Sequence, residues 1–579
     1  MRVPRVDRYF ILILFFSLFA LAPLSAPGYF SGAHDARHSV YFLQMFDQSM
    51  RDGAWFPRWA ADMVFGYGYP LWLILAPLPF FLGEAFHFVG LDFVSAVKLV
   101  DGVAIFFSAL AMFGFAARVF TPNKNAALVA AIAYVYIPYH LVDLYVRAAQ
   151  AELLSFVFPP LILWALYLLA EKQSARHVAY VGFAYAGLLL SHISMAMLFT
   201  PLIGMYILFL FLQQKIENHE SKNFSALRFA LVTFLGLALA FGIAAIFLLP
   251  VLAEQRYLTS EPLIGGFFSY RKHFLNASQL VSPFWGYGYA GENGADQFSL
   301  QLGLLPLFFA LIAIGRARAL TLQLKRHIFF FVAILAFTIF AMLPISANLW
   351  DSFASVIAFA QFPWRVLILA AVALAFLAGA AIATFAEFAR GSAPAILVCL
   401  LIVTANFTYT LPQHSEAVFN YAAQMEFEVK DRELLGDTIW TQTRPQDSPL
   451  VAQYLAGAPL QKAIALDDGA MVETIRHAGQ SDELRVVANQ PARILVLTRY
   501  FPGWTATLDG APLLIEPYGE QGLIFFRVSA GAHRVQLRFG DTPPRQLGAL
   551  ISLASILLAL GLIAKTFAPN HTPRHLSGI

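Results

Sequence analysis

The residues best suited to chemistry begin with four ionisable side chains that follow the first long apolar run: His34, Asp35, Arg37 and His38. An acidic side chain in this place lies where a lipid-borne substrate would present its headgroup. The alternative is structural, because Asp often caps the start of a helix, and by residue type the two roles are about equally frequent. The stretch that follows, with Val40, Leu43, Met45, Phe46 and Met50, is amphipathic and could lie on a membrane surface.

A second cluster is YHLVDLYVRAAQAE at 139–152, which includes His140, Arg147 and Glu152. Ionisable groups at membrane depth are costly, so they indicate a functional site by default. An Arg147–Glu152 pair that only joins two helix ends is the alternative.

A third signal is AQFPWR, in which Trp364 and Arg365 precede another apolar run. Arginine there could bind a phosphate with two parallel hydrogen bonds. An aromatic and basic anchor at the membrane interface is the commoner use of such a pair.

Two aromatic and glycine-rich segments also recur, FGYGYP with Tyr67 and Tyr69, and WGYGYA at 285–290. Tyrosine and tryptophan rings suit sugar rings, but they equally form the interfacial aromatic belt. The sequence contains no Walker A loop, dinucleotide-binding fingerprint, HExxH motif or nucleophile elbow.

The composition places these residues in a membrane protein. Of 579 residues, 59% are apolar and 13% are charged, whereas soluble domains contain about 45–50% and about 25%. The net charge of +3 comes with basic residues in short clusters between apolar runs, which argues against nucleic acid as a partner. Cys399 is the single cysteine, so a disulfide framework and a thiolate metal site are excluded.

Hydropathy and flanking charge predict about twelve transmembrane helices. They lie roughly at 9–27, 97–118, 126–142, 153–170, 178–192, 195–213, 229–250, 298–315, 328–345, 366–387, 394–411 and 545–565. Splitting 178–213 into two spans requires a tight turn at Ser191–Ser194. The first run could also be a cleavable signal peptide, which would leave the other spans unchanged.

Every second connection is basic, so the positive-inside rule predicts that both termini are cytoplasmic. The outer side then receives 28–96, 251–297 and 412–544, and any chemistry must lie on that side. Short alternating runs from about 484 to 540 predict antiparallel strands in a small β-sandwich. The predicted fold is therefore a membrane all-α bundle (1–411), an outer β-rich domain (412–544), and a last span with a cytoplasmic tail (545–579).

Together these stretches resemble a bacterial family labelled 6-pyruvoyl-tetrahydropterin-synthase-related membrane proteins and, more distantly, the GT-C glycosyltransferases. The resemblance covers most of the chain. Its motifs are His34-Asp35 with Arg37 and His38, GYGYP at 66–70, YHLVDLYVRAAQAE at 139–152, WGYG at 285–288 with Asp296, QLG at 301–303, FPWR at 362–365, YFPGWTATLDG at 500–510 and GAHRVQLRF at 531–539.

This resemblance implies a multi-pass protein of the bacterial cytoplasmic (inner) membrane in which Asp35 matches the acidic residue that acts on the acceptor. Many GT-C enzymes have a paired acidic motif there, whereas this chain has His34 beside one Asp, with Asp47 and Asp62 further on. A divalent metal is thus left open but unsupported, and no metal ligand or other cofactor is assigned.

The topology favours the same reading, because no predicted cytoplasmic loop is long enough to bind a nucleotide sugar. The expected function is transfer of a sugar from a polyprenyl-phosphate donor in the membrane lipid to a glycan, lipid or protein acceptor on the outer face. Asp35 would be the general base, and Arg365, with Arg147, would stabilise charge on the departing phosphate. A transporter or flippase of lipid-linked glycans, or a non-catalytic cell-envelope assembly protein, are the alternatives.

Overall fold

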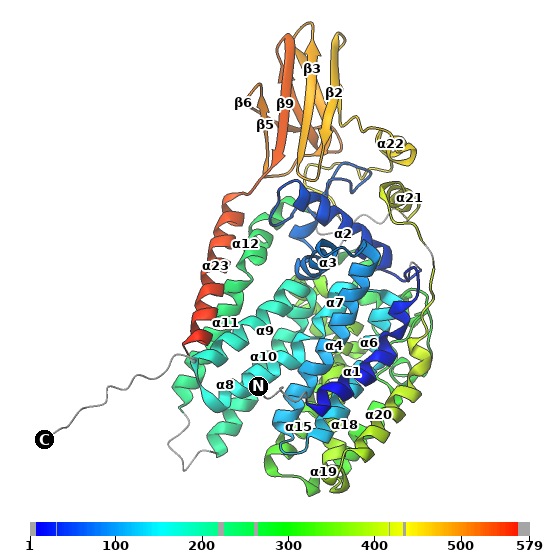
Figure 1. The fold of residues 1–579 in the computed structure, drawn as a ribbon, viewed down its shortest axis with the longest axis vertical. Helices are drawn as coiled ribbons and strands as arrows, with labels where there is room; N and C mark the ends of the chain where they lie inside the picture. The colour runs from blue at the N-terminus through cyan, green and yellow to red at the C-terminus, as the bar shows by residue number, and fades with distance from the viewer. Residues whose placement is uncertain are drawn as a thin grey trace, which may run out of the picture.

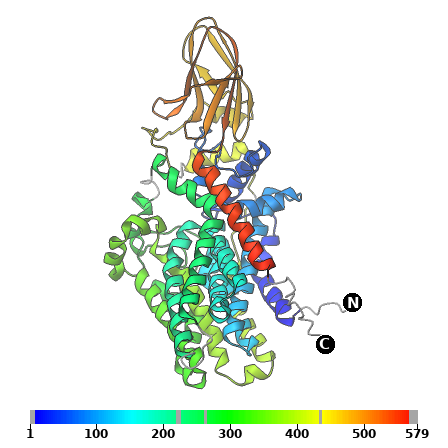
Figure 2. The same cartoon turned by 90° about the vertical axis from the view of Figure 1, so that its left-hand side faces the viewer.

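The computed structural model describes residues 7–30, 32–217, 225–259, 264–415, 417–431 and 436–565. A large helical region forms one end of the molecule and a β-sandwich stands at the other (Figures 1 and 2). The helical region contains α1 (Arg8–Leu21), α4 (Phe93–Val119), α5 (Lys124–Val135), α6 (Pro138–Val142), α7 (Gln150–Ser155), α8 (Phe158–Lys172), α9 (Ala175–Ser191), α10 (Ile193–Glu217), α11 (Ala226–Ile243), α12 (Ala245–Glu254), α14 (Leu304–Gly315), α15 (Leu322–Met342), α16 (Ala347–Ser352), α17 (Ala354–Ile357), α18 (Leu367–Ala383), α19 (Glu387–Arg390), α20 (Ala393–Ala405) and α23 (Pro543–Ala564).

Within the described residues, eight helical segments are long and apolar enough to cross a membrane. The pair Lys124–Val135 and Pro138–Arg147, bent by 43°, would make a ninth. The chain is therefore a multi-pass membrane protein, with eight or nine candidate spans rather than about twelve. The difference arises where α9, α14 and α20 have only 17, 12 and 13 residues. The predicted spans included apolar residues that lie outside these helices, such as 298–303 and 406–411.

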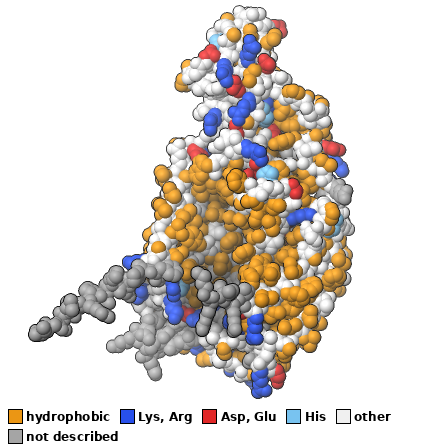
Figure 3. All heavy atoms as spheres, viewed as in Figure 1, with side chains coloured by type: hydrophobic (Ala, Val, Ile, Leu, Met, Phe, Trp, Pro, Cys, Tyr) orange, Lys and Arg blue, Asp and Glu red, His pale blue; other side chains and the backbone are white. Residues whose placement is uncertain are grey.

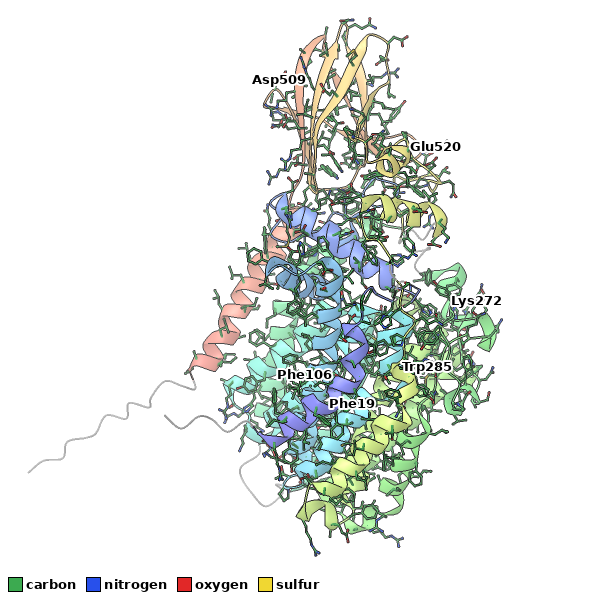
Figure 4. The ribbon with its side chains drawn as sticks, turned by 45° about the vertical axis from the view of Figure 1, so that its right-hand side comes forward. Phe19, Phe106, Lys272, Trp285, Asp509 and Glu520 are labelled. Atoms are coloured by element: carbon green, nitrogen blue, oxygen red, sulfur yellow. The ribbon has the colours of Figure 1, made fainter. Side chains whose placement is uncertain are left out.

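Helix α18 is the centre of the helical region, since 94% of an apolar stretch within Pro363–Ala383 is buried. It packs against α5, α14 and α15. A Cβ on Gly379 would lie 2.7 Å from the carbonyl oxygen of Ala126, so glycine permits the close approach of α18 and α5. Apolar side chains cover much of the visible outer surface of this region (Figure 3), and Phe19 of α1 and Phe106 of α4 lie on its flank (Figure 4).

The predicted break between the fifth and sixth runs is confirmed. Helix α9 ends at Ser191, His192 is extended with φ −160° and ψ 110°, and α10 begins at Ile193. Three of the predicted basic connections, at the N-terminus, near Lys124 and near Arg390, meet one another. Lys124 pairs with Asp7 at 3.1 Å, and the Nδ2 atom of Asn125 donates to the carbonyl of Gly391 at 2.9 Å. These connections therefore share one end of the bundle.

The first outer segment folds into α2 (Ala36–Arg51) and α3 (Leu78–Phe88). The amphipathic stretch predicted for a membrane surface forms α2, but its apolar face is buried inside the protein. Phe46 packs on Trp72 and Phe80 with ring centroids 5.1 and 5.8 Å apart. Amphipathicity alone could not distinguish a lipid surface from α3 and the outer domain as the partner of this face.

The C-terminal β-rich domain is a sandwich of two antiparallel sheets, as the alternating runs predicted. One sheet has the order β1-β4-β8-β7 and the other β2-β3-β9-β5-β6. The strands are β1 (Ala463–Ala465), β2 (Ala470–His477), β3 (Ser481–Ala488), β4 (Ala492–Arg499), β5 (Trp504–Leu508), β6 (Ala511–Leu513), β7 (Glu516–Tyr518), β8 (Leu523–Val528) and β9 (Gly531–Phe539). Helices α21 (Tyr421–Asp431) and α22 (Val451–Ala456) precede them.

Strand structure thus begins at Ala463 rather than near 484. The two earlier strands escaped the sequence analysis for a physical reason. Strand β2 lies at a sheet edge and exposes the apolar residues Met471 and Ile475. Apolar and polar residues therefore do not show along its sequence the alternation that is expected of a half-buried strand. The sandwich core is formed by residues such as Leu484, Ile494 and Val535, all fully buried.

Candidate functional site

The second and third sequence clusters meet, although Glu152 and Arg365 are 213 residues apart. The Glu152 carboxylate is 2.9 Å from Nη1 of Arg147 and 3.2 Å from Nε of Arg365. It also accepts a short hydrogen bond from the hydroxyl of Tyr139. Nη1 of Arg147 makes a further short ion pair with Asp143. We call Asp143, Arg147, Glu152 and Arg365 the mouth network.

The backbone that holds this network is irregular. Residues Asp143–Arg147 form a π-helical turn, and Ala148 has a left-handed φ of 47°. A π-turn redirects side chains that a continuous α-helix would spread over several faces, and such turns are frequent at functional sites. Gln361 likewise has φ 63°, and its side-chain oxygen accepts from Nη1 of Arg365 at 2.9 Å. Both arginines therefore depend on unusual turns for their positions.

The mouth network has spare hydrogen-bonding capacity. Among the described residues, the hydrogen bonds of Arg147 use Nη1, and those of Arg365 use Nε and Nη1. Within the described residues, Nε and Nη2 of Arg147 and Nη2 of Arg365 therefore have no hydrogen-bond partner. The two side chains retain 5% and 10% exposure. These N–H groups are available as hydrogen-bond donors.

Trp364 belongs to the wall of the network. It is 2% exposed, and the guanidinium of Arg147 lies over its ring at 4.9 Å. The alternative of a plain interfacial anchor does not fit an indole that is buried beneath a paired arginine. Likewise, Arg147 and Glu152 join more than two helix ends, since Glu152 also contacts Arg365 and Tyr139.

The loop of Asp35 lies directly on the π-turn. The backbone N–H of Asp35 donates to the carbonyl of Arg147 at 2.7 Å, and that of His34 donates to Val146 at 3.2 Å. Asp35 is exposed, it makes no side-chain capping bond although it occupies the N-cap position of α2, and its charge lies within Coulombic range of Arg147. The capping role is therefore not seen, and the carboxylate is open to solvent beside the network.

His34 joins this loop to the second aromatic and glycine-rich segment. Its Nε2 donates to the carbonyl of Gly288 at 2.8 Å, and its ring stacks on Tyr289 at 4.5 Å. Burial lowers the pKa of His34, so the ring is neutral at pH 7. Trp285 of the same segment lies on the side of the bundle (Figure 4), where it stacks on Tyr409 at 4.4 Å. His34 thus positions the Asp35 loop.

Other predicted site residues lie elsewhere. Arg37 lies over the ring of Phe427 at 5.3 Å, and His38 contacts the same ring at 5.1 Å, so both face α21. His140 is fully buried and stacks on Phe156 at 4.0 Å, which is a packing role. Tyr67 and Tyr69 are 6% and 0% exposed and lie in the apolar cluster beneath the sandwich.

Sequence reasoning missed Asp101, which lies inside the predicted span 97–118. It accepts from the hydroxyl of Tyr29 at 3.1 Å and from Nε2 of Gln150 at 3.4 Å. A carboxylate within a hydrophobic run was a sufficient signal.

Also missed was a buried junction between the first outer segment and the sandwich. Oδ1 of Asp62 is 2.9 Å from Nε2 of His477, and Nδ1 of that ring is 2.5 Å from Asp482. Although burial alone lowers the pKa of His477, Asp482 and Asp62 raise it to about 9. The pKa of Asp62 is lowered, because His477 outweighs the effect of its burial. We call Asp62, His477 and Asp482 the junction triad.

In the described residues, no group of three or more His, Cys, Asp or Glu side chains is placed to hold a metal ion. The search against protein-family models found no match. An uncharacterised protein of Lactococcus lactis subsp. cremoris (strain MG1363) is 24% identical over 251 residues, which are 43% of this chain and 40% of that protein. The chain thus matches less than half the length of this curated relative.

Among solved structures, the arabinofuranosyltransferase AftD from Mycobacteria aligns with a TM-score of 0.44 and 16% identity, over 78% of this chain and 31% of AftD. A mutant form of AftD gives the same TM-score over 77% and 32%.

Proposed function

We propose that this chain is a membrane glycosyltransferase that moves a sugar from a polyprenyl-phosphate donor to an acceptor on the outer face. The observation that supports it most is the exposed Asp35 carboxylate within Coulombic range of Arg147, which, like Arg365, retains N–H groups without a hydrogen-bond partner among the described residues. A base for an acceptor hydroxyl and cations for a lipid phosphate are the two groups that such a transfer requires.

In this mechanism the acceptor hydroxyl loses its proton to Asp35 as it attacks the anomeric carbon. The bond from that carbon to the lipid phosphate oxygen breaks, and the phosphate keeps the electron pair. Arg147 and Arg365 stabilise the added negative charge through their free N–H groups. A single displacement inverts the configuration at the anomeric carbon. Glu152 holds both guanidinium groups in place before the donor arrives.

The test is transfer from a synthetic polyprenyl-phosphate sugar by purified protein in nanodiscs. Asp35→Asn keeps the size of the side chain but cannot act as a base, so we expect transfer to fall by about 10²–10⁴-fold with the folded yield unchanged. Asp468→Asn, at an exposed position of the sandwich, is the matched control and should retain full activity. Full activity of the Asp35 variant would remove Asp35 from the mechanism.

A transporter or flippase would use the same charges without a chemical step. It predicts movement of labelled lipid between leaflets in the wild type and in Asp35→Asn alike. Such movement without any transferred sugar would favour this second candidate.

A further inference from the structure

A second cationic cluster lies beneath the sandwich, where the first outer segment meets the end of β4. Nη2 of Arg499 donates to Oδ1 of Asp437 at 2.8 Å, and Nε of Arg444 donates to Oδ2 of the same carboxylate at 2.9 Å. Among the described residues, Asp437 is the one carboxylate that hydrogen-bonds to either guanidinium. Two positive charges therefore share one negative charge.

Four polar atoms of this cluster are buried without a hydrogen-bond partner in the described part of the chain. They are Nε and Nη1 of Arg499, Nη2 of Arg444 and the hydroxyl of Tyr69. All of them can donate. A buried donor left unpaired is costly, and more so when it is charged, so a native fold rarely leaves several together.

Arg545 shows that this fold can satisfy a buried arginine. Its side chain is 0% exposed, as is that of Arg499. Yet Nε and Nη2 of Arg545 bind Glu254 at 3.1 and 2.8 Å, and Nη1 donates to the carbonyl of Gly540 at 2.8 Å. Arg545 is thus fully paired, whereas two of the three nitrogens of Arg499 are not.

Tyr69 belongs to the same charged cluster as the two arginines. Tyr69 interacts electrostatically with Arg499, Asp437 and Arg444. Gly436 approaches the Tyr69 hydroxyl so closely that a Cβ would lie 2.7 Å from it, and its φ of 146° also favours glycine. The Arg444 side chain is 36% exposed, whereas Asp437 is 12% exposed. Arg444 is therefore the most exposed charged member of the cluster.

We infer that Arg499, Arg444 and Tyr69 form a binding site for one oxyanion group, a carboxylate or a phosphate, which enters past Arg444. Such a group would balance the second positive charge and accept from the unpaired donors. Charge-assisted hydrogen bonds of this kind are about twice as strong as neutral ones. The site is independent of the proposed transfer, because none of its residues belongs to the mouth network. An acidic sugar or free phosphate could supply the group.

The test is thermal unfolding of the purified full chain in nanodiscs, titrated with inorganic phosphate or with glucuronate, at ionic strength held constant with chloride. We expect saturable stabilisation of the wild type by at least one of these two anions. Tyr69→Phe, which removes one neutral donor, should weaken binding about fivefold, and Arg444→Gln, which removes a charged donor, by about 10–100-fold. Stabilisation by glucuronate but not phosphate would identify an acidic sugar as the source, and the reverse result would identify phosphate.

Arg493→Gln is the matched control, because Arg493 pairs with Asp467 on the surface of the same domain and is 48% exposed. It should respond like the wild type. Equal responses to phosphate, glucuronate and chloride, or an unchanged response in Arg444→Gln, would overturn the inference. The readout requires no sugar transfer, so failure of the proposed transferase function would leave it unaffected.

Discussion

The mouth network and the junction triad are both buried clusters of opposite charges, but they differ in how completely they are paired. At the junction, both oxygens of Asp62 and both nitrogens of His477 have partners. At the mouth, both arginines retain unpaired N–H groups, and Oδ2 of Asp143 is buried without a partner among the described residues.

The backbones of the two clusters also differ in how regular they are. The mouth network is built on a π-turn and on left-handed residues, whereas His477 and Asp482 face each other across two paired antiparallel strands. Burial of charge alone therefore does not distinguish a functional site from a structural one. The proposed site differs from the junction in its unfilled hydrogen-bonding capacity and its unusual backbone, and such backbone features persist only where the surroundings enforce them.

The largest expected effect on stability is at the junction. Asp62→Ala removes one partner of a buried pair and should destabilise the protein by about 3–5 kcal/mol. Thermal unfolding in nanodiscs measures this effect, and Asp468→Ala, at an exposed site of the same domain, should change stability by less than about 0.5 kcal/mol. The folded fraction of Asp62→Ala should keep its transfer activity. An Asp62→Ala variant that is stable but inactive would instead assign a functional role to the junction triad.

A smaller effect concerns pH. Because the folded-state pKa of His477 is about 9 and its ordinary value is 6.5, its protonation stabilises the fold fully below about pH 6.5. This contribution is lost as pH rises through about 9. Lys462 has the opposite effect on the pH dependence of stability, because burial lowers the pKa of this lysine and its deprotonation at high pH favours the folded state.

The informative quantity is therefore the difference between wild type and His477→Gln in unfolding experiments from pH 6 to 10. The wild-type advantage should shrink as the pH approaches 10. A difference that stays constant over this range would show that His477 is not charged in the folded protein.

Much of the architecture followed from the sequence, since apolar runs and alternating strands are local patterns. The contact between Glu152 and Arg365 did not, because it depends on how distant helices pack. The two aromatic and glycine-rich segments look alike, yet only WGYGYA contacts the loop of Asp35 through His34, while Tyr67 and Tyr69 lie beneath the sandwich. Residue type could not separate these two environments.

The most direct test of the central claim, that the mouth network binds a lipid phosphate, is the affinity of purified protein for polyprenyl phosphate in nanodiscs. Lysine keeps the charge of Arg365 but loses the planar group that binds Glu152 and the donor together. We predict that Arg365→Lys weakens binding about tenfold and Arg365→Ala more, while Arg316→Lys, at the opposite end of the bundle, leaves it unchanged. Equal affinity of the wild type and Arg365→Lys, or a loss of affinity that only parallels a loss of thermal stability, would contradict the claim.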